Sequence, residues 1–130
     1  LAVGAAVGTT SGSLTTNGLA SFGPDEGEPD VEFAMTTVDA ECARLGVRPT
    51  VLKIDVEGYE HEVLRGARQL LRDHGPVVLL ELHVELLAER GTQVLDVLHE
   101  LVSLGYSLTA VSCPRRAGST PLQSMIPGLP

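Results

Sequence analysis

Two apolar runs of the sequence each end in ionisable side chains that could carry out chemistry. A strand points alternate side chains to opposite faces, so the ionisable groups of each run share one face. If the two runs are neighbouring parallel strands, these groups meet at the carboxyl edge of the sheet, where open parallel sheets bind ligands. Carboxylates and an imidazole in that place can accept a proton, balance a positively charged ligand or hold a metal ion. The side chains are Lys53, Asp55 and Glu57 in the first run and Glu81 and His83 in the second.

Each of these groups also has a purely structural interpretation. Lys53 and Asp55 could form an ion pair, and for Lys53 this is the interpretation we favour. Glu57 could complement the dipole of a helix that begins just after it. For Asp55 and Glu57 we favour a functional role, because ionisable groups on a buried strand are costly unless they reach water or a partner. For Glu81 and His83 the two interpretations stay open.

The elements that would position these groups alternate between strand and helix. Strands are expected at residues 51–56, 77–83 and 106–111, with amphipathic helices at 60–73 and 92–104 between them. The middle strand is apolar almost throughout, which is typical of a strand covered on both faces. This order predicts an α/β fold in which a parallel sheet is connected by right-handed crossovers.

Each of the two expected helices carries one apolar stripe, because its apolar residues recur at helical spacing. These stripes should face the core, while the arginines of the first helix face solvent. The residues expected to point inward are Val63, Leu64, Ala67, Leu70 and Leu71 in the first helix, and Val94, Leu95, Leu98, Leu101 and Val102 in the second.

The chain before residue 51 is expected to support this core. Residues 1–8 are small and apolar, which indicates a short buried strand whose glycines pack beside neighbouring backbone. Residues 9–30 are rich in turn-forming residues and predict a connecting loop or hairpin. Thr37 is a candidate N-cap for a short helix that ends at Gly46.

Composition excludes several classes of protein. The chain has 130 residues, which suits a single domain, and its net charge is −8 at pH 7. Phosphate-driven binding to nucleic acid is therefore disfavoured. No apolar run approaches the length of about 20 residues that a membrane-spanning helix needs. With no signal segment at its start, we expect a cytoplasmic location.

Several familiar catalytic motifs are absent from the sequence. His61-Glu62 begins like a zinc-protease helix, but Arg65 stands where the second histidine would be. The sequence contains no nucleophile elbow and no phosphate-binding Walker loop. It also lacks the glycine-rich turn that follows the first strand of dinucleotide-binding folds.

The run VLKIDVEGYEHEVLRGARQLL, followed by PVVLLELH, resembles the central signature of the FkbM family of S-adenosylmethionine-dependent methyltransferases. The upstream segments TTVDAEC and AVGAAVGTTSGSLT also resemble that family, so the similarity spans about residues 1–111. It implies a Rossmann-like class I methyltransferase fold, in which residues 51–56 are the fourth strand and 77–83 the fifth. It also implies an enzyme that methylates a hydroxyl of a sugar, polyketide or similar small molecule.

The family's first two strands, which carry most of the cofactor site, have no counterpart in these residues. We therefore expect residues 1–130 to be a partial methyltransferase domain that could be inactive alone. Within it, residues 1–50 hold the third strand, a loop or hairpin and a short helix. Residues 51–111 hold the core with the signature, and residues 112–130 form an irregular tail.

The resemblance implies a role for Asp55, and position and chemistry suggest roles for the other ionisable groups. Asp55 should lie near the methionine part of S-adenosylmethionine and balance its positive charge. Glu57 is the candidate for binding the acceptor hydroxyl or removing its proton, and His83 is the rival base because its ordinary pKa lies near neutrality. Glu81 could orient either partner.

Two further possibilities remain open at this point. No residue is assigned as a metal ligand, although the acidic cluster could hold Mg²⁺, which would lower the pKa of the acceptor hydroxyl. The chain could instead be a non-catalytic α/β binding module or the remnant of a truncated gene. A small-molecule acceptor is the expected partner, with neither nucleic acid nor membrane involved.

Overall fold

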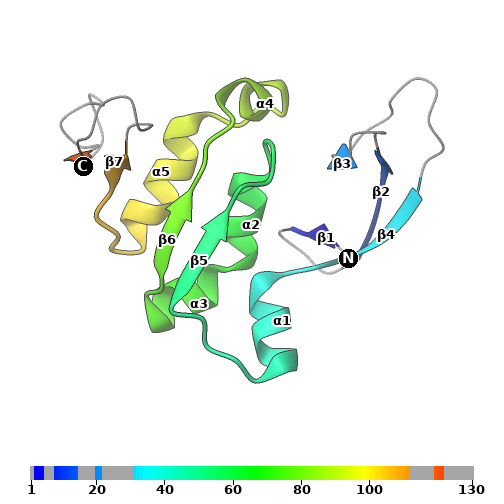
Figure 1. Cartoon of the computed structure of the whole chain (residues 1–130), viewed down its shortest axis with the longest axis horizontal. Helices are drawn as coiled ribbons and strands as arrows, with labels where there is room; N and C mark the ends of the chain where they lie inside the picture. Colours follow the sequence, from blue (N-terminus) through cyan, green and yellow to red (C-terminus); the bar gives the residue numbers. More distant parts are fainter. Residues whose placement is uncertain (1, 5–7, 15–19, 22–30, 112–118, 122–130) are drawn as a thin grey trace.

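A computed structural model describes residues 2–4, 8–14, 20–21, 31–111 and 119–121 of the chain (Figure 1). The tail expected at 112–130 therefore lies mostly outside the described residues. So does much of the loop expected at 9–30.

The centre of the structure is a pair of parallel strands, as the sequence predicts. β5 (Val51–Ile54) pairs with β6 (Val77–Leu80), and their residues align from the first of each strand to the last. Figure 1 shows the two strands side by side with their arrowheads pointing the same way. Both strands are shorter than expected, but the pairing continues beyond them, because the Glu81 N–H donates to the carbonyl of Ile54 at 3.0 Å.

Two short helices make the crossover between these strands, where the sequence predicts one. α2 (Glu60–Gly66) and α3 (Arg68–His74) are separated at Ala67, whose φ of −107° and ψ of 5° leave the helical region. The side chain of Asp39 accepts hydrogen bonds from the backbone N–H groups of Gln69 and Leu70, each at 2.9 Å. Asp39 thus satisfies free N–H groups at the start of α3, which makes a second helix start possible there.

Asp39 comes from α1 (Val38–Leu45), which has the ends that the sequence predicts. The hydroxyl of Thr37 accepts from the Ala40 N–H at 3.0 Å, and Gly46 ends the helix with a φ of 66°. A hydroxyl N-cap and a left-handed glycine are the common helix boundaries.

The core lies between these crossover helices, the β5–β6 pair and α5 (Val94–Ser103). The expected stripe of α2 and α3 is buried as predicted. In α5 the expectation for Leu95 is wrong, because that side chain is 39 % exposed while Val97 is fully buried. Positions 94, 97, 98 and 101 follow helical spacing, and position 95 falls outside that stripe. α4 (Val84–Glu89), which the sequence analysis did not identify, adds the buried Leu87.

One face of the β5–β6 pair is exposed, which corrects the expectation that β6 is covered on both sides. Val51, Val77 and Leu79 are 55 %, 60 % and 55 % exposed. The apolar character of this strand therefore does not by itself show cover on both faces, since the packed helices bury only the opposite side.

The segment expected as a third parallel strand is also different. β7 (Thr109–Val111) pairs antiparallel with β8 (Ser119–Pro121), and among the described residues it does not pair with β6. Instead, the hydroxyl of Tyr106 donates to the carbonyl of Pro76 at 3.0 Å. A side chain rather than the backbone thus joins this segment to the start of β6.

The N-terminal part forms a separate sheet with strand order β1-β4-β2-β3. β1 (Ala2–Val3) is parallel to β4 (Val31–Thr36), which is antiparallel to β2 (Gly8–Leu14), and β3 (Ala20–Ser21) pairs with β2. The short strand near the start is confirmed. β4 was not expected, whereas the antiparallel pair of β2 and β3 agrees with the hairpin alternative for residues 9–30.

Gly4 connects this sheet to the core, as expected for a small residue packed beside backbone. Its N–H donates to the carbonyl of Thr36 at 2.8 Å. A Cβ atom placed on Gly66 would lie 2.1 Å from the carbonyl oxygen of Gly4, so the two backbones touch where α2 ends. No helix among the described residues is long and apolar enough to cross a membrane.

Candidate active site

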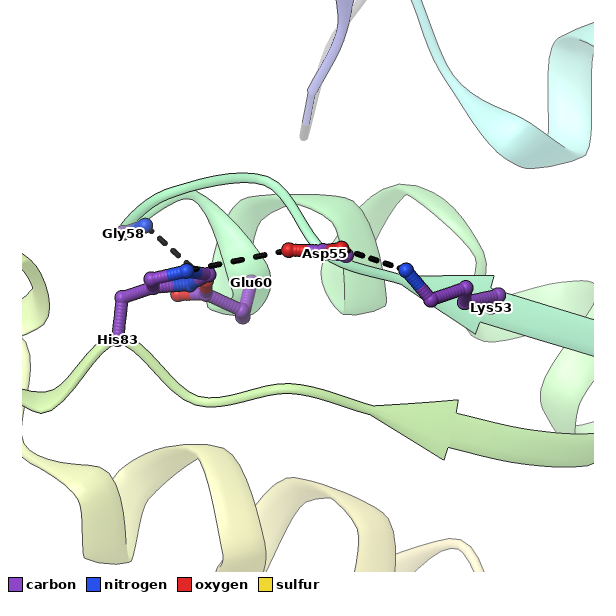
Figure 2. A network of polar contacts seen from close by, with 5 residues as sticks. All are labelled: Lys53, Asp55, Gly58, Glu60 and His83. Carbon is purple, nitrogen blue, oxygen red and sulfur yellow. Dashed lines mark hydrogen bonds and ion pairs between the residues drawn. The ribbon is translucent and has the colours of Figure 1, made fainter. Parts of the chain in front are cut away.

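Three of the ionisable groups singled out in the sequence meet beyond the carboxyl ends of β5 and β6. Asp55, Glu81 and His83 each offer a ligand atom, and these atoms lie within 4.8 Å of one another. The Nε2 atom of His83 is 3.8 Å from Oδ1 of Asp55 (Figure 2). We call this cluster the rim. The two carboxylates are exposed and His83 is half-buried, so a ligand can reach all three from solvent.

Lys53 forms the ion pair that the sequence analysis favoured. Its Nζ atom lies 2.5 Å from Oδ2 of Asp55, and the side chains are 63 % and 37 % exposed. The hydrogen bond with Lys53 is the main cause that lowers the pKa of Asp55, and the same bond raises the pKa of Lys53. Asp55 therefore stays ionised on the rim, with Oδ1 directed to His83 and Oδ2 to Lys53.

Glu60 is a member of this site that the sequence analysis missed. Its side chain is fully buried at the start of α2, and its Oε1 atom lies 2.8 Å from Nδ1 of His83. The same oxygen accepts the backbone N–H of Gly58 at 3.0 Å. Figure 2 shows Glu60 beneath the loop that leaves β5, with its carboxylate overlapping the imidazole of His83 in this view.

The environment of His83 favours its protonated form. The hydrogen bond to Glu60 is the main cause that raises the pKa of His83, and the charges of Glu60, Asp55 and Glu81 act in the same direction. Partial burial opposes them without reversing the shift. The imidazole thus binds a proton more tightly than an ordinary histidine does.

Glu57 lies on the same loop but does not join the cluster. Its side chain is exposed, and its φ of 48° makes it the one non-glycine residue with positive φ in the described part of the chain. The left-handed conformation costs an ordinary residue about 1–2 kcal/mol. Strain of this kind is concentrated at functional sites, so it supports the functional interpretation of Glu57.

Gly58 completes this turn and is required there for two reasons. Its φ is 91°, and a Cβ atom on it would lie 2.7 Å from Cβ of Leu86 and 3.1 Å from the Leu86 carbonyl carbon. The loop after β5 is thus packed directly on α4. Because the Gly58 N–H also binds Glu60, this packing fixes the carboxylate that contacts His83.

We expect Gly58→Ala to destabilise the protein more than Gly91→Ala, the matched control. Gly91 also has a positive φ, of 74°, but no atom of the described residues lies within 4 Å of its added Cβ atom. Both variants bear the cost of an unfavourable φ, whereas only Gly58→Ala adds overpacking, which costs about 1–3 kcal/mol. Urea unfolding measures the difference, and equal losses in the two variants would contradict the packing described above.

The rim also has the donor atoms of a cation site, since carboxylates and imidazole both bind divalent metal ions. Lys53 already supplies a positive charge to Asp55 through a direct contact. We assign the roles below to the side chains themselves and route no step through a metal ion.

Comparison with known protein families gives a match. Residues 2–108 match the family model of the methyltransferase FkbM domain. The chain is thus a methyltransferase by family, and it belongs to the FkbM family. No match was found among curated proteins or among solved structures.

Proposed function

We propose that the protein transfers the methyl group of S-adenosylmethionine to a hydroxyl of a small molecule such as a sugar or a polyketide. The family match supports methyl transfer, and the rim of acidic groups at the ends of β5 and β6 carries the proposal. Parallel sheets bind ligands at this edge. With this function we propose a Rossmann-like class I fold, of which the β5–α2–α3–β6 crossover is one unit.

The chemistry of the rim fits the charged end of the methyl donor. S-adenosylmethionine supplies an activated methyl group on a positively charged sulfonium, and its methionine part carries an ammonium group. Asp55 is exposed on the rim, and its pKa is lowered by Lys53, so it presents a stable negative charge. We therefore propose that Asp55 binds the positively charged end of S-adenosylmethionine.

The acceptor side of the proposal uses Glu57 and His83. Glu57 extends from the strained turn after β5 and is free to bind the acceptor hydroxyl, since it makes no polar side-chain contact among the described residues. In its neutral form His83 takes the hydroxyl proton at Nε2, the nitrogen nearest Asp55, while Glu81 orients the acceptor. A base of this kind contributes about 10²–10⁴-fold to a reaction rate.

The proposal is tested by incubating the protein with isotopically labelled S-adenosylmethionine and a panel of hydroxylated sugars and polyketides. Label transferred to an acceptor oxygen, located by mass spectrometry, is the expected result. If calorimetry detects no binding of S-adenosylmethionine and no panel member is labelled, the proposal is wrong. A non-catalytic α/β module would give that outcome.

Asp55→Asn is expected to weaken the binding of S-adenosylmethionine by about 10- to 100-fold, as removal of one interaction with a charged group does. Calorimetric titration measures the dissociation constant. The matched control is Asp73→Asn, because Asp73 is an exposed carboxylate that contacts Arg72 on α3 and not the rim. Unchanged affinity in Asp55→Asn would remove this residue from the donor site.

A further inference from the structure

We infer that Glu60 is a positioning residue that holds His83 in the tautomer whose free nitrogen faces the rim. This role rests on the proposed methyl transfer, but the tautomer of His83 can be measured without any substrate. Glu60 belongs to the DVEGYE part of the signature, but the sequence assigns it no role.

The proton between Glu60 and His83 lies either on Oε1 or on Nδ1. Oε1 of Glu60 is 2.8 Å from Nδ1 of His83 and also accepts the Gly58 N–H at 3.0 Å. An ionised carboxylate can only accept hydrogen bonds. With Glu60 as the carboxylate anion, Oε1 has no proton to donate, so Nδ1 is the donor in the 2.8 Å contact. The proton belongs on Nδ1 of His83.

The proton on Nδ1 determines which nitrogen of His83 can act as a base. A neutral imidazole carries one N–H, so a proton on Nδ1 leaves Nε2 with its lone pair. Nε2 is the atom that lies 3.8 Å from Oδ1 of Asp55, at the open side of the site. The proton acceptor thus points to the place where we propose that the acceptor hydroxyl binds, and Glu60 determines this orientation.

The buried surroundings of Glu60 keep its carboxylate beside His83. Its side chain has no solvent exposure, and a buried carboxylate is costly unless donors surround it. Gly58 and His83 supply two donors to Oε1, whereas Oε2 has no hydrogen-bond partner among the described residues. Because water does not compete for Oε1, the pair with His83 is kept in one geometry. A third group that orients the base is the usual arrangement in nucleophile and base pairs.

The test uses ¹⁵N-labelled protein in chelator-treated buffer, at a pH where the imidazoles are neutral. Long-range ¹H–¹⁵N spectra distinguish the Nδ1–H and Nε2–H forms of each histidine, and His61, His74 and His99 serve as internal references. We expect His83 to be in the Nδ1–H form in the wild-type protein. This measurement needs no variant, so it decides the question even if a variant fails to fold.

Glu60→Gln is then expected to reduce the Nδ1–H fraction of His83, because an amide can donate as well as accept and no longer dictates the tautomer. It should also lower kcat by about 10²-fold without changing the affinity for S-adenosylmethionine. Glu62→Gln, two residues further along the same helix, is the matched control and should change neither quantity.

The inference is overturned if wild-type His83 is mainly in the Nε2–H form, or if Glu60→Gln leaves the tautomer unchanged. An Nδ1–H tautomer in a protein that transfers no methyl group supports the Glu60–His83 arrangement and contradicts the proposed function instead. The two failures can therefore be told apart.

Discussion

Replacing His83 with glutamine is expected to lower the kcat of methyl transfer by about 10²–10⁴-fold, the range that a general base contributes. The affinity for S-adenosylmethionine should change little, because Asp55 keeps its contact with Lys53 in the variant. Glutamine can still accept a hydrogen bond but cannot take a proton at neutral pH. Steady-state kinetics with the acceptor identified from the panel, together with calorimetric titration of the donor, measure the two effects.

His99→Gln is the control for this prediction. His99 lies on α5 and is exposed, so its replacement should leave kcat and donor affinity unchanged. If His83→Gln keeps the wild-type kcat, His83 is not the base, and proton removal has to be assigned to Glu57.

Glu57→Gln is expected to lower kcat/KM for the acceptor by about 10- to 100-fold, which is the effect of losing a hydrogen bond to a charged group. The loss should be mainly in KM if Glu57 binds the acceptor and mainly in kcat if it removes the proton. The free energy of unfolding should be unchanged, because the glutamine keeps the size of an exposed side chain.

A second variant separates the side chain of Glu57 from its backbone strain. Glu57→Gly relieves the strain of a φ of 48° and should unfold at the same or a higher urea concentration, yet it should show the same loss in kcat/KM. Glu89→Gln, an exposed carboxylate on α4, is the control. Wild-type kcat and KM in Glu57→Gln would show that this residue does not contact the acceptor.

The positions of the rim residues were predictable because strand alternation is a local property. Residues 51–57 alternate between apolar and ionisable side chains, and the structure keeps Leu52 and Ile54 toward the core and Lys53 and Asp55 toward solvent. Parallel pairing with β6 then brings Asp55 close to His83. The sequence thus predicts the meeting of these groups, although it does not predict their distances.

The role of Glu60 could not be predicted because it depends on a contact between residues 23 positions apart. As the first residue of α2, Glu60 looks like a first-turn carboxylate that complements the helix dipole. Only the packing of the loop on α4 turns it inward and buries it beside His83. The signal that could have identified it is a glutamate two residues after the glycine of a tight turn, in reach of a histidine that follows the next strand.

Long-range contacts also explain where the structure differs from the fold expected from the sequence. The break between α2 and α3 depends on Asp39, which is 30 residues from Gln69 in sequence, and a local pattern does not contain that contact. The segment before β7 has strand character, but its alternation does not specify a partner. In the structure its neighbour is β8, and the hydroxyl of Tyr106 donates to the carbonyl of Pro76 before β6.

We propose that the rim at the ends of β5 and β6 binds the methyl donor. This binding is tested most directly by adding S-adenosylmethionine to ¹⁵N-labelled protein and following the backbone amide signals. We expect the largest saturable shifts at Asp55, Gly58 and Glu81, with the amides of α1 unaffected. Saturable shifts that fall on α1 and leave Asp55, Gly58 and Glu81 unchanged would contradict this binding site.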